Sequence, residues 1–133
     1  DVVYYYIISN EESLSQKFNP DFYNKIDISF RSLENLYESK NMIDEYGDAI
    51  YQWNAQRLWE GFLSINSKQC KYNFKEKVHF VNTGLSTVSY QKYLQHKPRE
   101  FSTVKRLIMG IKNPVLLTIA VSVFNGLIRI FRR

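Results

Sequence analysis

Hydrophobic residues near the start of the chain form an uninterrupted run, which is typical of a buried β-strand. Residues 2–8 are all β-branched or aromatic, the side chains that fit a pleated sheet. Such a strand is rarely stable alone, so we expect it to be the last strand of an α/β core whose other strands lie upstream. Tyr4 and Tyr6 share one face of it. They belong either to the sheet core or to the rim of a ligand cleft, because strand ends in α/β sheets point at binding sites.

Beyond this run, apolar residues recur every three or four positions, the spacing of one helix face. Asn19 and Pro20 suit an N-cap and a first helical position, and predict a helix over 20–45 that ends near Gly47. Its apolar face would carry Ile26 and Phe30, with Glu34 on the polar side. The predicted fold class is therefore mainly α, a bundle of five to six helices preceded by one β-strand. The further helices are expected over 48–64, 73–82, 86–95, 101–112 and 114–131.

The composition is that of a globular domain with many aromatic residues. The chain has 133 residues, which suits one domain, and 44% are hydrophobic and 16% aromatic. Cys70 is the only cysteine in the sequence, so no internal disulfide can form. A single thiol favours a reducing compartment, and we expect a cytoplasmic location, with a peripheral position on the inner membrane face as an extension of it.

Positive charge is concentrated in the last quarter of the chain. Residues 1–98 carry 11 Lys and Arg against 12 Asp and Glu, a net charge of −1, whereas residues 99–133 carry seven against one, a net charge of +6. Basic residues beside an apolar segment are attracted to anionic lipid head groups. The candidates for membrane docking are Lys105, Arg106, Lys112, Arg129, Arg132 and Arg133.

The apolar segment between Lys112 and Arg129 contains sixteen uncharged residues. A transmembrane helix needs about 20 predominantly apolar residues, so this segment is short for a span. Two other interpretations stay open and can coexist: a core helix of the bundle, or a helix lying in a membrane interface. Nucleic acid is a disfavoured partner, because the arginines flank an apolar run and are not interleaved with stacking aromatic residues.

Catalytic motifs are missing from the sequence. His79, His96 and Cys70 do not have the spacing of metal ligands or of a nucleophile with its base. The sequence contains no glycine-rich phosphate loop and no Asp-x-Asp pair for a divalent ion. It therefore predicts no catalytic, cofactor-binding or metal site within these residues.

Three short motifs resemble the end of bacterial family-2 glycosyltransferases of the GT-A type. They are the strand with Tyr4-Tyr5-Tyr6, the turn with Ser13-Leu14-Ser15 and the helix start Phe18-Asn19-Pro20. In that family the tyrosine-rich strand closes the nucleotide-sugar-binding core, and a helical C-terminal region follows. The stretch 89–94, with a basic and apolar helix after it, is similar to the tails of members that build surface polysaccharides. Ile7 is a departure, because an arginine often follows the tyrosines, and it puts in doubt any contact of this strand with a phosphate.

The resemblance implies a division of the chain and a function for its parent. Residues 1–18 would end the missing catalytic core, 19–98 would form a helical domain, and 99–133 would form a basic, apolar tail. The whole enzyme would transfer a sugar from a nucleotide-sugar donor to a surface glycan, and the nucleotide sugar and a divalent metal would bind upstream. These residues would pack on the core, shape the acceptor side, and dock on an anionic membrane or on a second copy of the chain.

The alternative is a helical interaction module or peripheral membrane protein unrelated to sugar transfer. The parent reading frame discriminates between the two. An upstream α/β segment with an Asp-x-Asp motif supports the glycosyltransferase, and a methionine immediately before Asp1 contradicts it.

Overall fold

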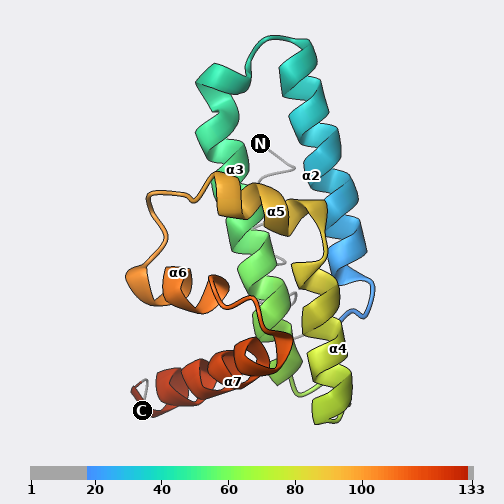
Figure 1. Ribbon diagram of the computed structural model, residues 1–133, viewed down its shortest axis with the longest axis vertical. Coiled ribbons are helices and arrows are strands. Elements are labelled where there is room, and N and C mark those ends of the chain that lie inside the picture. The colour runs from blue at the N-terminus through green and yellow to red at the C-terminus, as the bar shows by residue number, and fades with distance from the viewer. Residues whose placement is uncertain (1–17, 132–133) are drawn as a thin grey trace.

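The described part of the chain, residues 18–131 of a computed structural model, is mainly helical (Figure 1). It contains six α-helices and a 3-10 helix, and no strand is found among these residues. The predicted N-terminal strand lies outside the described residues. The elements are α2 (Phe22–Ser39), α3 (Ile43–Leu63), η1 (Ser64–Asn66), α4 (Phe74–Leu85), α5 (Val88–Gln95), α6 (Thr103–Met109) and α7 (Pro114–Phe131).

The first two helices form a long hairpin that extends beyond the rest of the bundle (Figure 1). The predicted helix over 20–45 is wrong at its end, because α2 stops at Ser39 and α3 already begins at Ile43. Asn41 makes the turn with a φ of 56°, a left-handed conformation that asparagine tolerates better than most residues. Gly47 lies inside α3 and ends no helix.

The core is an aromatic cluster in which Tyr23 of α2 is central. Its ring lies 4.7 Å from that of Phe80 on α4 and 5.5 Å from that of Phe62 on α3, measured between centroids. Gly61 and Gly84 make room for it, since a Cβ atom at Gly61 would lie 2.6 Å from Tyr23 Cε1 and one at Gly84 would lie 2.7 Å from Tyr23 Cζ. Gly84 is thus a packing residue inside α4, which continues past the predicted end at residue 82.

The helices after the hairpin begin within two residues of the predicted starts at 73, 86 and 101. Asn73 and Glu76 form a reciprocal capping box at the start of α4. Thr87 and Ser102 cap α5 and α6 through their hydroxyl oxygens, which accept hydrogen bonds from the backbone N–H groups of Tyr90 and Lys105. These caps define the helix starts in the structure, whereas the predicted end at residue 112 is wrong, because α6 stops at Met109.

The last helix, α7, runs across the end of the bundle opposite the α2–α3 turn and packs against α3, α4 and α6 (Figure 1). Leu117 and Val121 are fully buried against the core, and the ring of Phe124 meets that of Trp59 edge-on at 5.1 Å. Its observed bounds agree with the range predicted from Pro114 onward.

Candidate membrane-docking surface

The α7 helix has two apolar faces with opposite environments. Leu117, Thr118 and Val121 are fully buried on the inner face, where the Thr118 hydroxyl donates to the Pro114 carbonyl oxygen at 2.6 Å. On the outer face Leu116 is 57% exposed and Val123 is 56% exposed. One face therefore completes the core, and the other is left open.

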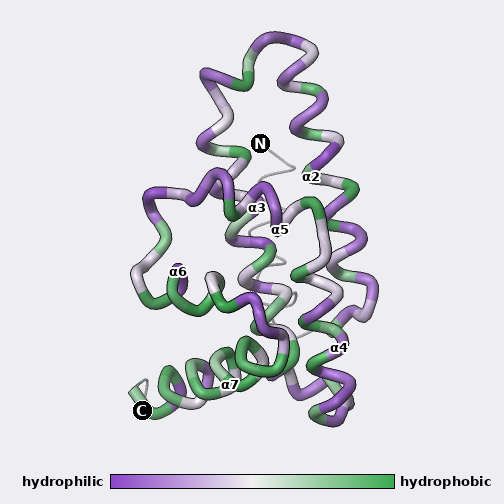
Figure 2. Tube along the Cα trace, viewed as in Figure 1, coloured by the Kyte–Doolittle hydropathy of each residue, from purple (hydrophilic) through white to green (hydrophobic). Residues whose placement is uncertain are grey.

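We call the open face the α7 outer face. Figure 2 shows α7 as an almost continuously hydrophobic helix at one end of the molecule. A contiguous exposed apolar patch is typical of a site for protein or membrane contact. Its exposed apolar residues are Val115, Leu116, Ile119, Val123, Leu127, Ile130 and Phe131.

The predicted docking cations differ in whether they contact the rest of the protein. Lys112, just before α7, and Arg129, in its last turn, are exposed at the two ends of the outer face. Lys105 and Arg106 face other parts of the protein. The Lys105 ammonium lies 5.8 Å from the ring centre of Trp59, and the Arg106 guanidinium donates to the Pro98 carbonyl oxygen. Of these four, Lys112 and Arg129 are the ones free to meet a head group.

The remaining predicted site residues fall outside the described part of the chain. These residues are Arg132 and Arg133 of the tail and Tyr4 and Tyr6 of the expected cleft rim.

The packing of α7 bears on how this helix could meet a membrane. Pro114–Phe131 is long and apolar enough to qualify as a candidate span by length and composition. Because α7 packs along α4 and α6, a spanning position would also draw the charged side chains of those helices toward the hydrocarbon.

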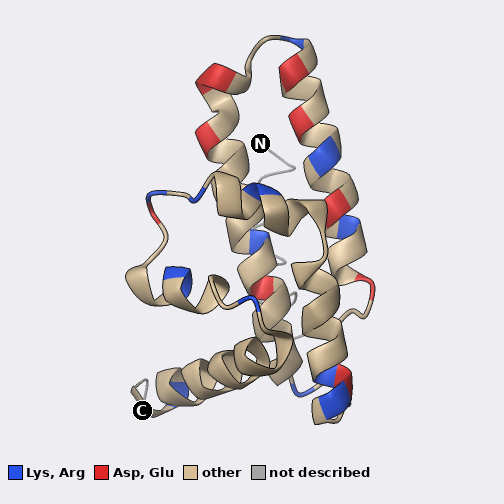
Figure 3. Ribbon diagram, in the orientation of Figure 1, with Lys and Arg blue, Asp and Glu red and all other residues tan. Residues whose placement is uncertain are grey.

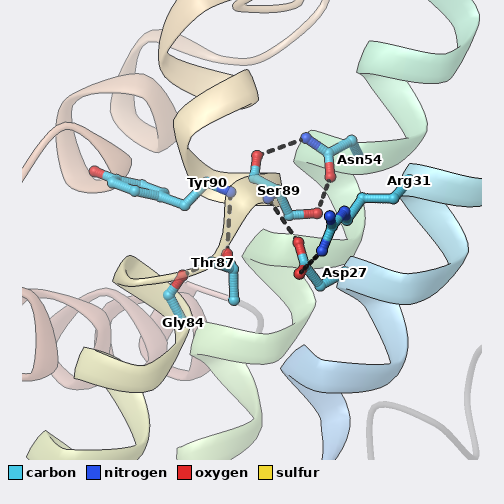
Figure 4. Close-up of polar contacts among 7 residues, drawn as sticks. All are labelled: Asp27, Arg31, Asn54, Gly84, Thr87, Ser89 and Tyr90. Carbon is cyan, nitrogen blue, oxygen red and sulfur yellow. Dashed lines mark hydrogen bonds and ion pairs between the residues drawn. The ribbon is translucent and has the colours of Figure 1, made fainter. Parts of the chain in front are cut away.

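A buried polar network fixes α5 across the hairpin (Figure 4). The Asn54 amide on α3 donates to the Ser89 carbonyl oxygen at 2.9 Å, and the Ser89 hydroxyl donates back to Asn54 Oδ1 at 2.6 Å. The Asp27 carboxylate on α2 accepts the Ser89 N–H at 2.9 Å. Every group in this network has its partner, so it serves to position α5 and leaves no atom directed at a ligand.

Glu34 occupies a buried position on α2, so the prediction that it lies on the polar side is wrong. Its carboxylate accepts a hydrogen bond from the Tyr51 hydroxyl at 3.2 Å and pairs with Lys92 at 3.4 Å. Burial, followed by the negative charge of Glu34, raises the pKa of Tyr51 to about 12. The cluster joins α2, α3 and α5 through one carboxylate.

A groove of about 770 Å³ lies beside this cluster, between the start of α3 and the loop that leads to α6. Tyr51 lines it, and its ring stacks on that of His96 at 4.1 Å with an interplanar angle of 4°. The remaining lining is mixed in charge, with Asp44 and Asp48 from α3 and Lys97 from the loop. Side chains of both signs in an open groove select no class of ligand, so α7 remains the stronger candidate.

Periodicity could not have revealed the outer face of α7. The polar residues Thr118, Ser122, Asn125 and Arg129 do recur on one side of the helix, but Thr118 in this row is fully buried, so the polar side does not mark the direction of the solvent. The sequence analysis also did not identify Val104 and Leu107 on α6 as exposed, although Leu107 is 70% exposed. The packing of α7 on α3 and α4 decides which face is open, and that packing depends on residues far away in the sequence.

Comparisons with known proteins gave no match, whether the chain was compared with protein-family models, with curated proteins or with solved structures.

Proposed function

We propose that this chain is a membrane-docking helical region that lays the α7 outer face into the interface of an anionic membrane. The observation that supports it most strongly is the row of exposed apolar side chains on α7, bounded by Lys112 and Arg129. Binding at a membrane interface has two contributions, burial of apolar side chains at the acyl boundary and attraction of cations to anionic lipid. The apolar residues of the α7 outer face suit the first contribution, and the cations suit the second. The basic tail residues Arg132 and Arg133 would extend the same field.

We further propose that the docked region belongs to a bacterial glycosyltransferase of family 2. The support is the resemblance of the first twenty residues to the end of that family. In this proposal the chemistry resides in an upstream core that holds the nucleotide sugar and the metal, and the chain alone transfers no sugar. Turnover of any nucleotide sugar by the isolated chain would contradict this assignment, as would a reading frame that begins with a methionine just before Asp1.

Vesicle co-sedimentation tests the docking surface. The variant carries Leu116→Gln, Ile119→Gln and Val123→Gln, which remove apolar groups from the exposed side of α7 and leave its buried side intact. Burial of a large aliphatic side chain contributes about 1.5–3 kcal/mol, so we expect binding to vesicles rich in phosphatidylglycerol to fall at least a hundredfold. Circular dichroism would check that the helical content is unchanged.

The matched control replaces three apolar residues that are exposed elsewhere, with Ile28→Gln, Leu36→Gln and Tyr46→Gln on α2 and α3. Its binding should equal that of the unaltered chain. Arg129→Gln combined with Arg132→Gln and Arg133→Gln should weaken binding, and added salt should do the same. Wild-type binding by the α7 variant, or binding indifferent to lipid charge, would refute the proposal.

A further inference from the structure

The two ends of the molecule's long axis differ in charge, with carboxylates predominating around the α2–α3 turn and lysines at the opposite end (Figure 3). The segment 34–48, around the α2–α3 turn, contains five carboxylates and one lysine, a net charge of −4. The segment 67–77, which ends in the first turn of α4, contains four lysines and one carboxylate, a net charge of +3. The near-neutral total of residues 1–98 therefore conceals an acidic end and a basic end.

The basic segment lies at the same end of the molecule as α7 (Figure 3). Lys68, Lys71 and Lys75 have exposed side chains, and within residues 18–131 none of them forms an ion pair. The acid among them, Glu76, is held in the capping box, where its carboxylate accepts the Asn73 N–H at 3.1 Å. These three lysines of one short segment are therefore not neutralised, and we call them the α4 lysine patch.

The position of the α4 lysine patch near α7 indicates which kind of partner it would contact. α4 packs directly against α7, and the lysine patch lies in the first turn of α4 and in the segment before it, at the same end of the bundle as α7. Apolar side chains beside unpaired cations suit a surface that is apolar below and anionic above, which is the interface of an anionic bilayer. A nucleic acid would use the cations and leave the apolar side chains of α7 in water.

We propose that the α4 lysine patch is a second contact with the anionic lipid surface, and that it orients the domain with the α2–α3 turn pointing away from the membrane. This inference rests on the proposed docking of α7 and deepens it. The acidic turn supports the same orientation, because carboxylates are repelled from an anionic surface. The domain would then have two separate contacts with the membrane, α7 in the interface and the lysine patch on the head groups. Two contacts fix the tilt of the domain, whereas a single contact would leave the tilt variable.

Charge substitution tests the contact. The variant Lys68→Gln, Lys71→Gln, Lys75→Gln should bind phosphatidylglycerol vesicles on the order of a hundredfold more weakly, since each cation near an anionic surface contributes roughly a fivefold gain. The control Lys40→Gln, Lys97→Gln, Arg99→Gln removes three exposed positive charges from elsewhere in the molecule. It should bind within about threefold of the unaltered chain, because charges beyond a Debye length are screened.

The outcomes separate this inference from the docking proposal. If the α7 variant loses binding while the α4 lysine variant does not, the lysine contact is refuted and the docking of α7 stands. If both variants bind normally, both proposals fail. Equal losses in the lysine variant and its charge-matched control would show a non-specific effect of net charge and overturn the lysine contact. A preference for an oligonucleotide over vesicles, weakened by the α4 substitutions, would overturn it as well.

A label at Cys70 tests the orientation directly. This residue is the single cysteine of the chain, lies between Lys68 and Lys71, and is partly exposed. A fluorophore on it should be quenched strongly by lipids with nitroxide head groups. The same fluorophore in the variant Cys70→Ser, Ser39→Cys, where the label is at the end of α2, should escape quenching. Equal quenching at both positions, or stronger quenching at residue 39, would contradict the proposed orientation.

Discussion

Three tyrosine hydroxyls in the core differ in how well they are satisfied. The Tyr90 hydroxyl donates to the Met109 carbonyl oxygen at 2.6 Å, a group at the end of α6 that the helix itself leaves unpaired. The hydroxyls of Tyr23 and Tyr93 are buried with no hydrogen-bond partner in the described part of the chain. A buried donor without a partner costs stability, whereas a paired one contributes to it.

Replacing these tyrosines by phenylalanine should therefore have opposite effects. We expect Tyr23→Phe to raise the free energy of unfolding by about 1 kcal/mol, since it removes an unsatisfied hydroxyl. Tyr90→Phe should lower it by about 1–3 kcal/mol, because a buried carbonyl then loses its donor. Urea denaturation followed by circular dichroism measures both. Destabilisation of similar size in the two variants would show that the Tyr23 hydroxyl has a partner after all.

The same tyrosines predict how the fold responds to alkali. Burial raises the pKa of Tyr90 to about 12, as it does for Tyr51, and raises the pKa of Tyr23 and Tyr93 as well. A tyrosine whose pKa is higher in the folded state than in the unfolded state contributes stability that is fully present below pH 10 and is lost as the pH rises toward 12.

The free energy of unfolding should therefore decrease above pH 10, by up to about 1.4 kcal/mol per pH unit for each such tyrosine. Denaturant titrations at a series of pH values measure the slope. Tyr51→Phe should make it shallower, because one proton fewer is released on unfolding. A slope that Tyr51→Phe leaves unchanged would mean that this hydroxyl titrates as freely in the folded chain as in the unfolded one.

At the scale of the helices, glycines have different roles that sequence alone does not separate. A Cβ atom at Gly84 would lie within 2.9 Å of both Tyr23 and Phe62, whereas one at Gly126 would meet nothing within 4 Å. Gly84 therefore allows a close approach between helices that a larger side chain would prevent. Gly126 has no neighbour that requires a glycine.

We expect Gly84→Ala to lower the free energy of unfolding by about 1–3 kcal/mol through overpacking. Gly126→Ala, on α7, should raise it by up to about 1 kcal/mol, because alanine has the higher helix propensity. Thermal or urea denaturation of the two variants provides the comparison. A neutral effect at Gly84 would show that the ring of Tyr23 can move aside.

Helix positions were largely predictable from the spacing of apolar residues and from the residues that interrupt it. The start of α7 at Pro114 and the caps of α4, α5 and α6 are local features, and local features can be recognised in a sequence. The break between α2 and α3 was misplaced because Gly47 offers a stronger stop signal than Asn41, yet Asn41 makes the turn. The burial of Glu34 could not be predicted, because Tyr51 and Lys92 reach it from two other helices.

For the molecule as a whole, the candidate site was predicted in part. The net charge of the tail identified its cations as candidates, and the structure shows that Lys112, just before α7, and Arg129, in its last turn, are exposed. Lys105 and Arg106 lie against Trp59 and Pro98 instead. The lysines of the α4 lysine patch were overlooked because summing charge over 98 residues cancels them against an acidic segment at the opposite end of the fold. Only the fold shows that the acidic segment 34–48 and the basic segment 67–77 lie at opposite ends of the molecule.

The small number of buried residues in α7 has a consequence for the dynamics of this helix. No residue after Val121 is buried among those described, so the last turns of the helix depend on little tertiary packing. Short helical stretches without such support are marginal in water. Backbone amides of residues 126–131 should exchange with deuterium rapidly in the free chain and much more slowly on anionic vesicles, with residues 117–121 protected in both states. Equal exchange with and without vesicles would contradict this. In this view the membrane supplies the missing half of the environment that the end of α7 needs in order to stay folded.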